Sequence, residues 1–455
     1  MAKNDGLNRR LFLKRAGITA FAAGAAGAVG SGPLSAVAAA AAAEAAGGGK
    51  YDFDTPYSRV GTDSVKWDQA IRTYKKPNLI AGMGIADMDF RCAPCITNAL
   101  TERIKHENWG YLDMPKEYTA AVVAWNKKRY NLDIDPESMV LTTGVHPGII
   151  ATLRAYAPPG SKVLLNTPTY NGFYGDLRAT NTLPEDVPMR NDKGKFSIDF
   201  DEFERHISHD TNVYILCNPQ NPTGNMWSPA DLLKIGQICL AHRVLVIADE
   251  IHCDFAMKGV KYTPFASLPD KAVVNNSVTF KACSKSFSLA AMKNAWGFST
   301  NPDIIAKVRA NNRADITTLG MVANKAALTE GADWLDQLLP YIDTNHDMVV
   351  NFMKTKLPQI TVAKAQGTYL QWVDVSYVAQ KIGAKQKAAS MSSGRRQMSA
   401  EQVVQDWFAE NAGVALNAGS SYGTGGENHQ RMNIATSKKT LQAALDAMAT
   451  AVNKL

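Results

Sequence analysis

Residues 213–224 read Val-Tyr-Ile-Leu-Cys-Asn-Pro-Gln-Asn-Pro-Thr-Gly, an apolar run that passes directly into a turn. A second apolar run, Val244 to Ala248, passes in the same way into Asp249-Glu250-Ile251-His252. Continuous apolar runs, in contrast to alternating ones, are typical of strands that are buried on both faces of a parallel sheet. Between the two runs, a helix-like stretch begins at Ser228-Pro229, with Ser as the cap and Pro at the first helical position. The sequence therefore predicts a β-α-β unit.

A third apolar run, Val278-Thr279-Phe280, precedes Ser284-Lys285. In open parallel sheets, ligands bind in the crevice outside the carboxyl ends of the strands. Asn221, Asp249 and Lys285 each follow one of the three predicted strands. We therefore expect three separate segments of the chain to converge on one crevice.

The residue types in this crevice suit pyridoxal 5'-phosphate. A lysine amine can bond the aldehyde of this cofactor, and an aspartate beside the pyridine nitrogen keeps that nitrogen protonated. We expect Lys285 and Asp249 to have these roles and to be the catalytic residues. The amide of Asn221 can donate to the phenolate oxygen of the ring, and Tyr170 can stack on the ring face.

The cofactor phosphate requires a separate anion site. The stretch Thr143-Gly144-Val145-His146-Pro147 opens an apolar, helix-like segment that runs through Ala157. A helix N-terminus that follows a glycine presents free N–H groups and a positive dipole end to an anion. We therefore expect Gly144, Val145 and His146 to bind the phosphate, with Ser284 and Lys293 as further candidates.

Four further stretches extend the pattern: Arg59 to Asp68, Ala86 to Phe90, Trp109-Gly110-Tyr111 and Arg431-Met-Asn-Ile-Ala-Thr436. With them, the chain from about Arg59 to its end resembles the fold-type I pyridoxal-phosphate enzymes of aminotransferase class I/II. Within that family it is similar to the cystathionine β-lyase, or C–S lyase, branch. The resemblance implies an α/β fold with a large domain built on a mainly parallel sheet and a smaller α+β C-terminal domain.

The resemblance also implies a homodimer. Tyr111 matches a tyrosine that reaches the cofactor phosphate of the neighbouring subunit, and Arg431 matches an arginine that binds the substrate α-carboxylate. A planar guanidinium suits this role because it binds a carboxylate through two parallel hydrogen bonds. His252 stands where general aminotransferases usually place tyrosine, and it is either a cofactor contact or a packed histidine. His146 and Lys293 depart from the family, which usually has an apolar residue and a glutamine there.

The function that the resemblance implies is β-elimination on L-cystathionine or related cysteine S-conjugates, which yields pyruvate, ammonia and a thiol. The alternative is an aminotransferase of L-amino acids, which uses the same residues. A third reading is a cofactor-loaded protein that acts as a regulator or binding partner. Turnover with a thiol-bearing amino acid would distinguish the enzymes from this third reading.

The N-terminal stretch Asn8-Arg9-Arg10-Leu11-Phe12-Leu13-Lys14 resembles a twin-arginine signal, and Ala36-Val37-Ala38 supplies a small-residue cleavage region. We expect export through the twin-arginine translocase to the periplasm or the medium. A membrane anchor is the competing reading, but the Ala and Gly of the middle region contribute little to insertion. Residues 1–38 carry five basic residues and one acidic residue, so their removal lowers the net charge from +7 to +3. Such a mild charge argues against binding to nucleic acid.

The predicted organisation has four parts: residues 1–46 form the signal and an Ala-rich linker, 47–92 an N-terminal arm, 93–330 the large cofactor-binding domain and 331–455 the small domain. Residues 377–398 look like a basic, polar insertion and are predicted to form a solvated surface loop.

The six cysteines do not predict a metal site. Cys92 and Cys95 have the two-residue spacing of zinc and redox motifs, but no second pair completes a zinc set. A disulfide between them is left open by the sequence, since the compartment can be oxidising. We expect the remaining thiols to be small buried hydrophobic groups; they belong to Cys217, Cys239, Cys253 and Cys283.

Overall fold

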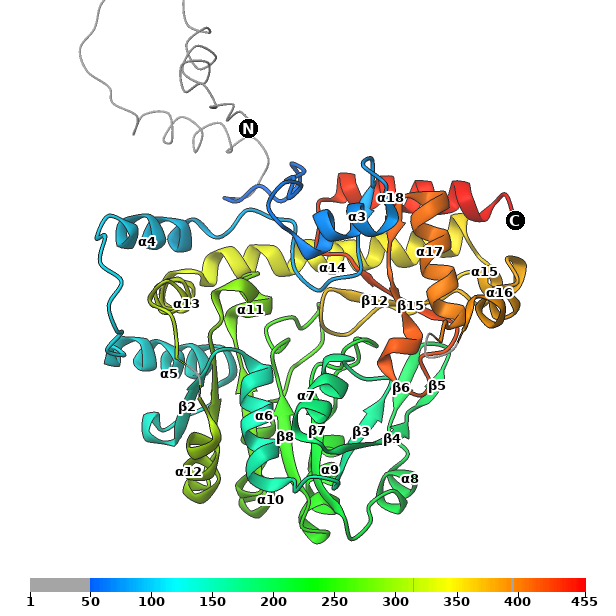
Figure 1. Cartoon of the computed structure of the whole chain (residues 1–455). Helices are drawn as coiled ribbons and strands as arrows, with labels where there is room; N and C mark the ends of the chain where they lie inside the picture. The colour runs from blue at the N-terminus through cyan, green and yellow to red at the C-terminus, as the bar shows by residue number, and fades with distance from the viewer. Residues whose placement is uncertain (1–49, 314, 394–396) are drawn as a thin grey trace, which may run out of the picture. The chain divides into compact units, whose positions relative to one another are not determined.

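The computed structural model describes residues 50–313, 315–393 and 397–455 (Figure 1). The chain divides into two units, of which the larger is Phe53–Leu455. The predicted export signal and Ala-rich linker, residues 1–46, lie outside the described residues. The predicted domain boundary after residue 330 falls inside the larger unit and stays a prediction.

The larger unit is built on a seven-stranded sheet. Its order is β2-β10-β9-β8-β7-β3-β4, and β10 runs antiparallel to the other six strands. The strands span, in that order, Met139–Thr142, Ala295–Phe298, Ser277–Lys281, Leu245–Asp249, Thr211–Cys217, Lys162–Thr167 and Leu183–Pro188. The mainly parallel sheet predicted from the apolar runs is therefore confirmed.

The predicted β-α-β unit is also confirmed, as β7, α9 (Pro229–Ala241) and β8. The side chain of Ser228 accepts a hydrogen bond from the backbone N–H of Asp231, and the Asp231 side chain accepts one from the backbone N–H of Ser228. This reciprocal capping box satisfies two N–H groups that would otherwise lack partners at the start of the helix. It therefore fixes where α9 begins after the turn at 218–224.

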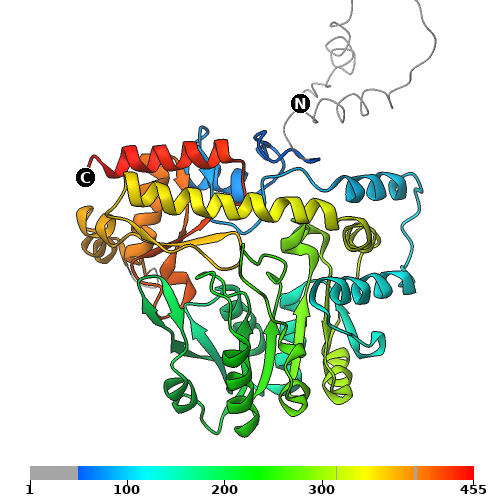
Figure 2. The ribbon, with the colours of Figure 1, turned by 180° about the vertical axis from the view of Figure 1, so that it is seen from behind.

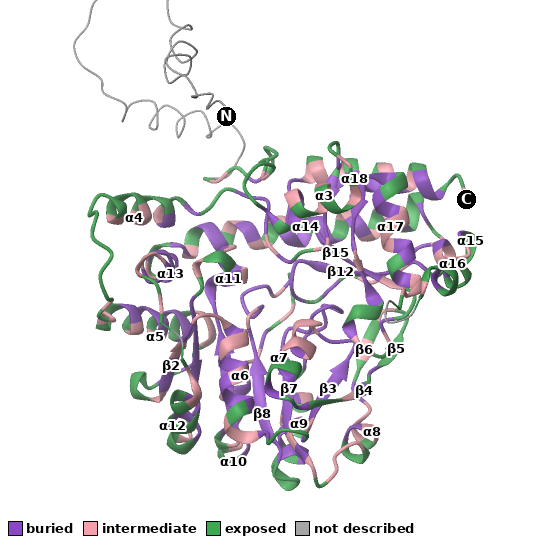
Figure 3. Cartoon of the chain, viewed as in Figure 1, coloured by how far each residue is buried: buried purple, intermediate pink, exposed green. Residues whose placement is uncertain are grey.

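The central strands are continuous apolar runs because helices cover both faces of the sheet (Figure 3). On β7, Val213, Ile215 and Cys217 join one core cluster, whereas Tyr214 and Leu216 join another. The first cluster includes side chains of α6 (Val145–Tyr156), α7 (Gly172–Thr180) and α12 (Pro302–Asn311). The second includes side chains of α8 (Phe200–Arg205), α9 and α10 (Lys271–Asn275).

A second, four-stranded antiparallel sheet has the order β11-β12-β15-β14. These strands span Thr361–Val362, Leu370–Asp374, His429–Asn433 and Asn417–Ala418. The long helix α14 (Ala332–Lys356) crosses the unit beside α18 (Lys438–Val452), as Figure 2 shows from behind.

Shorter elements surround the two sheets. Strand β1 (Ala81–Gly82) pairs in parallel with β13 (Val414–Ala415), and β5 (Arg190–Asp192) pairs with β6 (Lys195–Ser197). Helix α13 (Thr318–Glu330) packs against α4 (Pro94–Ile104) and α5 (Lys116–Tyr130). Two further short helices are α3 (Ala70–Tyr74) and α11 (Cys283–Ser286). In the part of the chain that the structure describes, no helix has the length and apolar character needed to span a membrane.

The prediction of a surface loop over residues 377–398 is wrong for most of that range. Two helices, α15 (Ser376–Lys381) and α16 (Ala384–Met391), occupy it and pack against α17 (Ala400–Ala412). Their physical basis is a narrow apolar stripe, because Ala384 and Ala388 lie one turn apart on α16 and are both buried. Alanine also has the highest helix propensity, which outweighs the basic and polar residues around it.

Candidate active site

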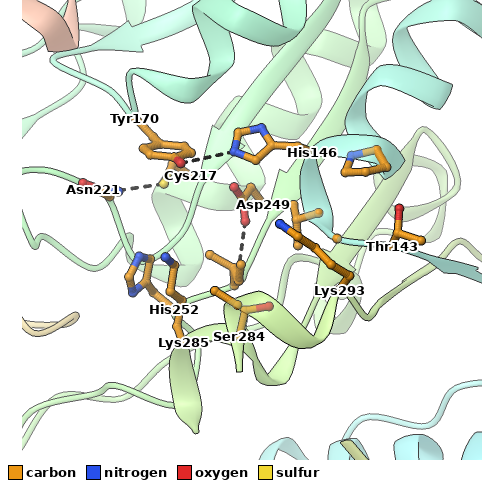
Figure 4. A pocket seen from close by; sticks show the side chains of 15 residues that line it. Thr143, His146, Tyr170, Cys217, Asn221, Asp249, His252, Ser284, Lys285 and Lys293 are labelled. Atoms are coloured by element: carbon orange, nitrogen blue, oxygen red, sulfur yellow. Dashed lines mark hydrogen bonds between the residues drawn. The ribbon is translucent and has the colours of Figure 1, made fainter. Parts of the chain in front are cut away.

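The carboxyl ends of β7, β8 and β9 meet at a cavity of about 420 Å³. Figure 4 shows Asp249 in the centre of this view, between Tyr170 and His146 on one side and Lys285 on the other. The cavity is lined by every predicted site residue except Tyr111 and Arg431, namely Gly144, Val145, His146, Tyr170, Asn221, Asp249, His252, Ser284, Lys285 and Lys293. The structure therefore brings together the segments that the sequence predicted to converge.

Asp249 is the last residue of β8, and only 4% of its surface is exposed. Its Oδ1 accepts a hydrogen bond of 3.1 Å from the backbone N–H of Ile251. Burial raises the pKa of Asp249 to about 6, although the Ile251 hydrogen bond and the charges of His146 and Lys285 favour ionisation. A carboxylate with so raised a pKa lacks sufficient positive partners and suits a cationic ligand group.

Lys285 lies on the short helix α11, and its Nζ donates a hydrogen bond of 2.9 Å to the backbone oxygen of Ala86. Burial and the nearby charge of Arg431 lower the pKa of Lys285 to about 8, against the opposing charges of Asp87 and Asp249. A larger share of this amine is therefore neutral near neutral pH than for an ordinary lysine. A neutral amine can bond a carbonyl carbon or accept a proton, which an ammonium group cannot.

Arg431, on β15, contacts the site through Asn221. Its Nη1 donates to Oδ1 of Asn221 at 3.0 Å, and its Nη2 donates to the backbone oxygen of Gly84 at 2.7 Å. The guanidinium has only donors, so it fixes Oδ1 of Asn221 on its own side and leaves the amide N–H groups of Asn221 for another acceptor. The Nε of Arg431 is buried and has no hydrogen-bond partner in the structure, and the guanidinium lies 5.1 Å from the ring centre of Tyr422.

The start of α6 lies at the cavity, where the sequence predicts the anion site. Gly144 is its N-cap residue with φ of 149°, a conformation that other residues rarely adopt. This backbone leads the chain from β2 directly into the helix, so the first N–H groups of α6 face the cavity end that Gly144 and Val145 line. Ser284 and Lys293 line the same cavity, and Lys293 supplies a positive charge there.

His146 takes part in an arrangement that the sequence did not predict. Its Nδ1 lies 2.7 Å from Oδ2 of Asp176 on α7, and its Nε2 lies 3.1 Å from the hydroxyl of Tyr170. Asp176 was missed, although a signal for it existed: on α7 it shares the buried stripe of Phe173, Leu177 and Thr180. A carboxylate at a position where the helical period predicts an apolar residue indicates a buried partner.

His252 is 2% exposed, and neither of its ring nitrogens has a hydrogen-bond partner in the structure. Burial lowers the pKa of His252 well below its usual value, and the charges of Lys285 and Arg431 lower it further, so the ring is neutral. The imidazole packs edge to face against Tyr369, with ring centres 5.7 Å apart. His252 is thus both packed and at the cavity, and its unsatisfied nitrogens suit a polar ligand group.

The N-terminal arm supports Lys285, which the sequence also did not predict. The Ala86 oxygen that accepts from Lys285 also accepts from the Tyr369 hydroxyl at 3.0 Å. Next to it, Asp87 receives two hydrogen bonds from the guanidinium of Arg59, at 2.7 and 2.9 Å. The arm therefore contributes a backbone acceptor and a negative charge to the surroundings of the amine.

Two predicted features lie apart from the cavity. Tyr111 is fully exposed, on the segment between α4 and α5.

Cys92 and Cys95 are both free thiols, so the disulfide that the sequence left open is not formed in the structure. The four remaining cysteines are buried, as predicted. Within the described ranges, no group of three His, Cys, Asp or Glu side chains is placed to hold a metal ion.

The donor set fits pyridoxal phosphate at each of its polar parts. A buried carboxylate, a helix N-terminus and an amine of lowered pKa border one cavity, and they match a ring nitrogen, a phosphate and an aldehyde. The unpartnered nitrogens of His252 and the free amide donors of Asn221 provide further hydrogen-bonding groups beside them. We therefore take these residues as the candidate cofactor site, and their individual roles stay predictions.

Comparisons with known proteins agree with this fold and cofactor. The sequence profile of the family "Aminotransferase class I and II" matches residues 80–448. The chain is 34% identical over 401 residues to the cystathionine beta-lyase PatB of Bacillus subtilis, which covers 87% of this chain and 98% of that protein. It is 26% identical over 411 residues to the protein MalY of Escherichia coli, covering 88% and 99% of the two chains.

Solved structures of pyridoxal-phosphate enzymes have a similar fold. Cystalysin from Treponema denticola, which contains pyridoxal 5'-phosphate, superposes with a TM-score of 0.81 at 28% identity and covers 89% of this chain and 99% of its own. The PLP-bound C–S lyase from Staphylococcus hominis superposes with a TM-score of 0.78 at 28% identity, covering 88% and 98%.

We predict that the Lys285 amine titrates near pH 8 in the cofactor-free protein. Competitive acylation between about pH 6 and pH 11, read by peptide mass spectrometry, measures this midpoint. Arg431→Gln should raise the pKa because a nearby positive charge is lost, and Asp87→Asn should lower it because a negative charge is lost. Exposed Lys454 in the same digest is the control. A Lys285 midpoint equal to that of Lys454 would contradict the prediction.

Proposed function

The chain belongs to the aminotransferase class I and II family, whose fold-type I members use pyridoxal phosphate, and from this membership we propose that it is a C–S lyase. Its substrates are L-cystathionine or related cysteine S-conjugates, and its products are pyruvate, ammonia and a thiol. The observation that carries the proposal is the meeting of the Lys285 amine and the buried Asp249 carboxylate in one cavity, in a chain that is 34% identical to a cystathionine beta-lyase.

The residues that would hold the cofactor follow from the donor set. Asp249 would pair with the ring nitrogen, Asn221 would donate to the ring oxygen, and the start of α6 with Ser284 and Lys293 would bind the phosphate. When bound, the cofactor supplies an electron sink that stabilises negative charge at the α-carbon of an amino acid. The buried charge of Asp249 strengthens that sink, because a cation next to it gains more from the pairing in a site of low dielectric constant.

The chain's own groups then act on the substrate. Arg431 binds the α-carboxylate, for which its unpartnered Nε is available. Lys285 removes the proton from the α-carbon and holds it at Nζ, since its lowered pKa keeps the amine neutral for part of the time near neutral pH. The hydrogen bond to the Ala86 oxygen keeps Nζ at the cavity wall.

Elimination is favoured over transamination by the relatives that share most of the chain's length. PatB of Bacillus subtilis bears the name cystathionine beta-lyase, and the Staphylococcus hominis structure is that of a C–S lyase. The alternative is favoured by a more distant relative, a probable aspartate/prephenate aminotransferase of Aquifex aeolicus at 23% identity. Both reactions begin with proton removal by Lys285, so an experiment must follow the products.

We expect purified protein loaded with pyridoxal phosphate to convert L-cystathionine into pyruvate, ammonia and a thiol through many turnovers without an added 2-oxo acid. A transaminase without an acceptor stops after about one turnover per site, because its cofactor is left in the amine form. Pyruvate is measured with a coupled dehydrogenase, and the thiol with a disulfide reagent.

The matched control for this assay is Lys285→Ala, which should abolish pyruvate release while leaving the protein folded. A wild-type reaction that stops after one turnover and resumes on addition of a 2-oxo acid would refute the lyase and favour the aminotransferase. Absence of any turnover with a range of cysteine S-conjugates would favour a regulatory or binding role.

We propose further that the active unit is a homodimer in which Tyr111 reaches the cofactor site of the neighbouring subunit. Support comes from its exposure, since an aromatic side chain that is fully exposed and lies away from its own cavity suits an interface. Trp109 and Ile104, which are half exposed on the same part of the chain, add apolar area there.

Subunit mixing tests the dimer. Lys285→Ala and Tyr111→Ala should each be impaired as pure proteins, but a mixed dimer has one site with Lys285 from one chain and Tyr111 from the other. In an equal mixture of co-folded chains, about half of the dimers are mixed and one of the two sites in each is intact. The mixture should therefore recover about a quarter of wild-type turnover. Recovery of none, with mixed dimers verified by tagged chains, would show that Tyr111 serves its own subunit or no site.

We propose that the protein is exported in folded form by the twin-arginine translocase to the periplasm or the medium. The support is the sequence alone, because residues 1–49 lie outside the described residues. Changing Arg9 and Arg10 together to Lys should trap the precursor in the cytoplasm, measured by cell fractionation and immunoblotting. Undiminished export of this variant would show that the N-terminal segment works by another route.

A further inference from the structure

Asp176, His146 and Tyr170 form a chain of hydrogen bonds from the interior of the protein to the cavity wall. Asp176 is 4% exposed and lies 2.7 Å from Nδ1 of His146. The Nε2 of His146 lies 3.1 Å from the hydroxyl of Tyr170, the contact drawn as a dashed line in Figure 4. Both His146 and Tyr170 line the cavity that Lys285 enters.

Glycine at position 172 makes this arrangement possible. A Cβ atom at Gly172 would lie 2.5 Å from Cε1 of His146 and 2.5 Å from Cε1 of Tyr170, which is closer than non-bonded atoms approach. The two rings therefore occupy space that any larger residue at 172 would fill, and their centres stand 5.3 Å apart. The contact between the two rings thus depends on the backbone of α7.

The charge of His146 is set by the groups that face it. Burial lowers the pKa of His146, but the hydrogen bond and charge of Asp176 on α7 and the charge of Asp249 on β8 outweigh that effect, so the pKa is raised. Lys285 on α11 opposes the rise, and Lys293 lines the same cavity. The proton on His146 can exchange with water, because 41% of the side chain is exposed.

The charge of His146 decides which way the Tyr170 hydroxyl points. A charged imidazole donates from both nitrogens, so Nδ1–H bonds Asp176 and Nε2–H bonds the Tyr170 oxygen. The Tyr170 O–H is then free to donate into the cavity. A neutral imidazole that keeps Nδ1–H on Asp176 has Nε2 as an acceptor, and this acceptor draws the Tyr170 O–H away from the cavity.

We propose that Asp176 and His146 are positioning residues that turn the Tyr170 O–H into the cavity, where Tyr170 protonates the sulfur that leaves the substrate. This inference rests on the lyase function proposed above. The carbon–sulfur bond breaks with both electrons on sulfur, and the Tyr170 hydroxyl proton passes to that sulfur. The Nε2–H proton of His146 then passes to the Tyr170 oxygen, and His146 regains a proton from water. No oxidant or further reactant is required.

Two substrates distinguish this role from a structural one. An S-alkyl cysteine loses a thiolate that needs a proton, whereas β-chloro-L-alanine loses chloride, which does not. His146→Gln and Asp176→Asn should lower kcat for the S-alkyl substrate by about tenfold or more, with KM little changed, because a positioned acid is lost. Asp176→Asn, a change at a residue that does not line the cavity, should change kcat for β-chloro-L-alanine by less than about twofold.

The pH dependence gives a second readout. Elimination from the S-alkyl substrate needs charged His146, so its kcat should fall as pH rises through the His146 pKa. Asp176→Asn removes the group that raises this pKa, so the fall should move to lower pH. The kcat for chloride elimination should not fall as pH rises through the His146 pKa.

A third readout needs neither cofactor nor turnover. Carbon-13 labelled histidine in the cofactor-free protein, assigned by loss of one signal in His146→Gln, gives the titration midpoint of His146 by NMR. Asp176→Asn should lower that midpoint. The matched control is the surface pair of His242 and Glu204, whose ring nitrogen and carboxylate oxygen lie 2.8 Å apart. Glu204→Gln should leave the His146 midpoint and both elimination rates unchanged.

The outcomes separate this inference from the proposed function. Equal losses on both substrates would show that the pair is only structural, and unchanged rates on both would show that it has no role; either result overturns the inference. An unchanged His146 midpoint in Asp176→Asn overturns it as well. Failure of the wild-type protein to eliminate from either substrate would overturn the lyase function itself.

Discussion

The buried carboxylate of Asp249 is the constraint on which the rest of the site depends. Its pKa is raised from 3.8 to about 6, so holding it ionised at neutral pH costs about 3 kcal/mol of stability at most. The sign follows from the raised value: the folded chain holds this proton more tightly, so the stability linked to it is greatest below pH 4 and is lost as pH rises through 6. A bound cationic ring would offset that cost, because it would place a positive charge beside the buried carboxylate of Asp249.

Burial lowers the pKa of Lys285 but raises that of Asp249, because it disfavours the charged form of each group. The same low-dielectric cavity therefore leaves more of the lysine in its neutral, proton-accepting form and makes the aspartate a better partner for a cation. Neither shift comes from local sequence. Both follow from the meeting of β8, α11 and the arm at one cavity, which explains why Asp249 and Lys285 can share a site without forming a direct ion pair with each other.

The sequence was sufficient for features encoded by neighbouring residues. The unbroken runs before Asn218 and Asp249 predict strands with two buried faces, and Ser228-Pro229 predicts the start of α9. Features that depend on distant residues were not predictable in this way. Asp176 is 30 residues from the His146 that it contacts. The helices α15 and α16 depend on a buried stripe of small alanines, whose contribution is visible only once α17 packs over it.

The N-terminal arm shows how residues outside the cavity can govern it. Helix α11 has four residues, too few to be stable alone, so contacts must hold Lys285 in place. Its amine is anchored to Ala86, 199 residues away in the sequence, and Ser286 donates to the buried Asp254. The arm is held in shape by its own ion pairs, because the buried ammonium of Lys66 lies 2.8 Å from Asp89, which also pairs with Arg59 at 3.4 Å. Removing Lys66 would leave the buried Asp89 with only the longer Arg59 contact, which is destabilising. The arm therefore docks with its charges paired, and its docking supplies the Ala86 carbonyl that keeps the amine of Lys285 at the cavity.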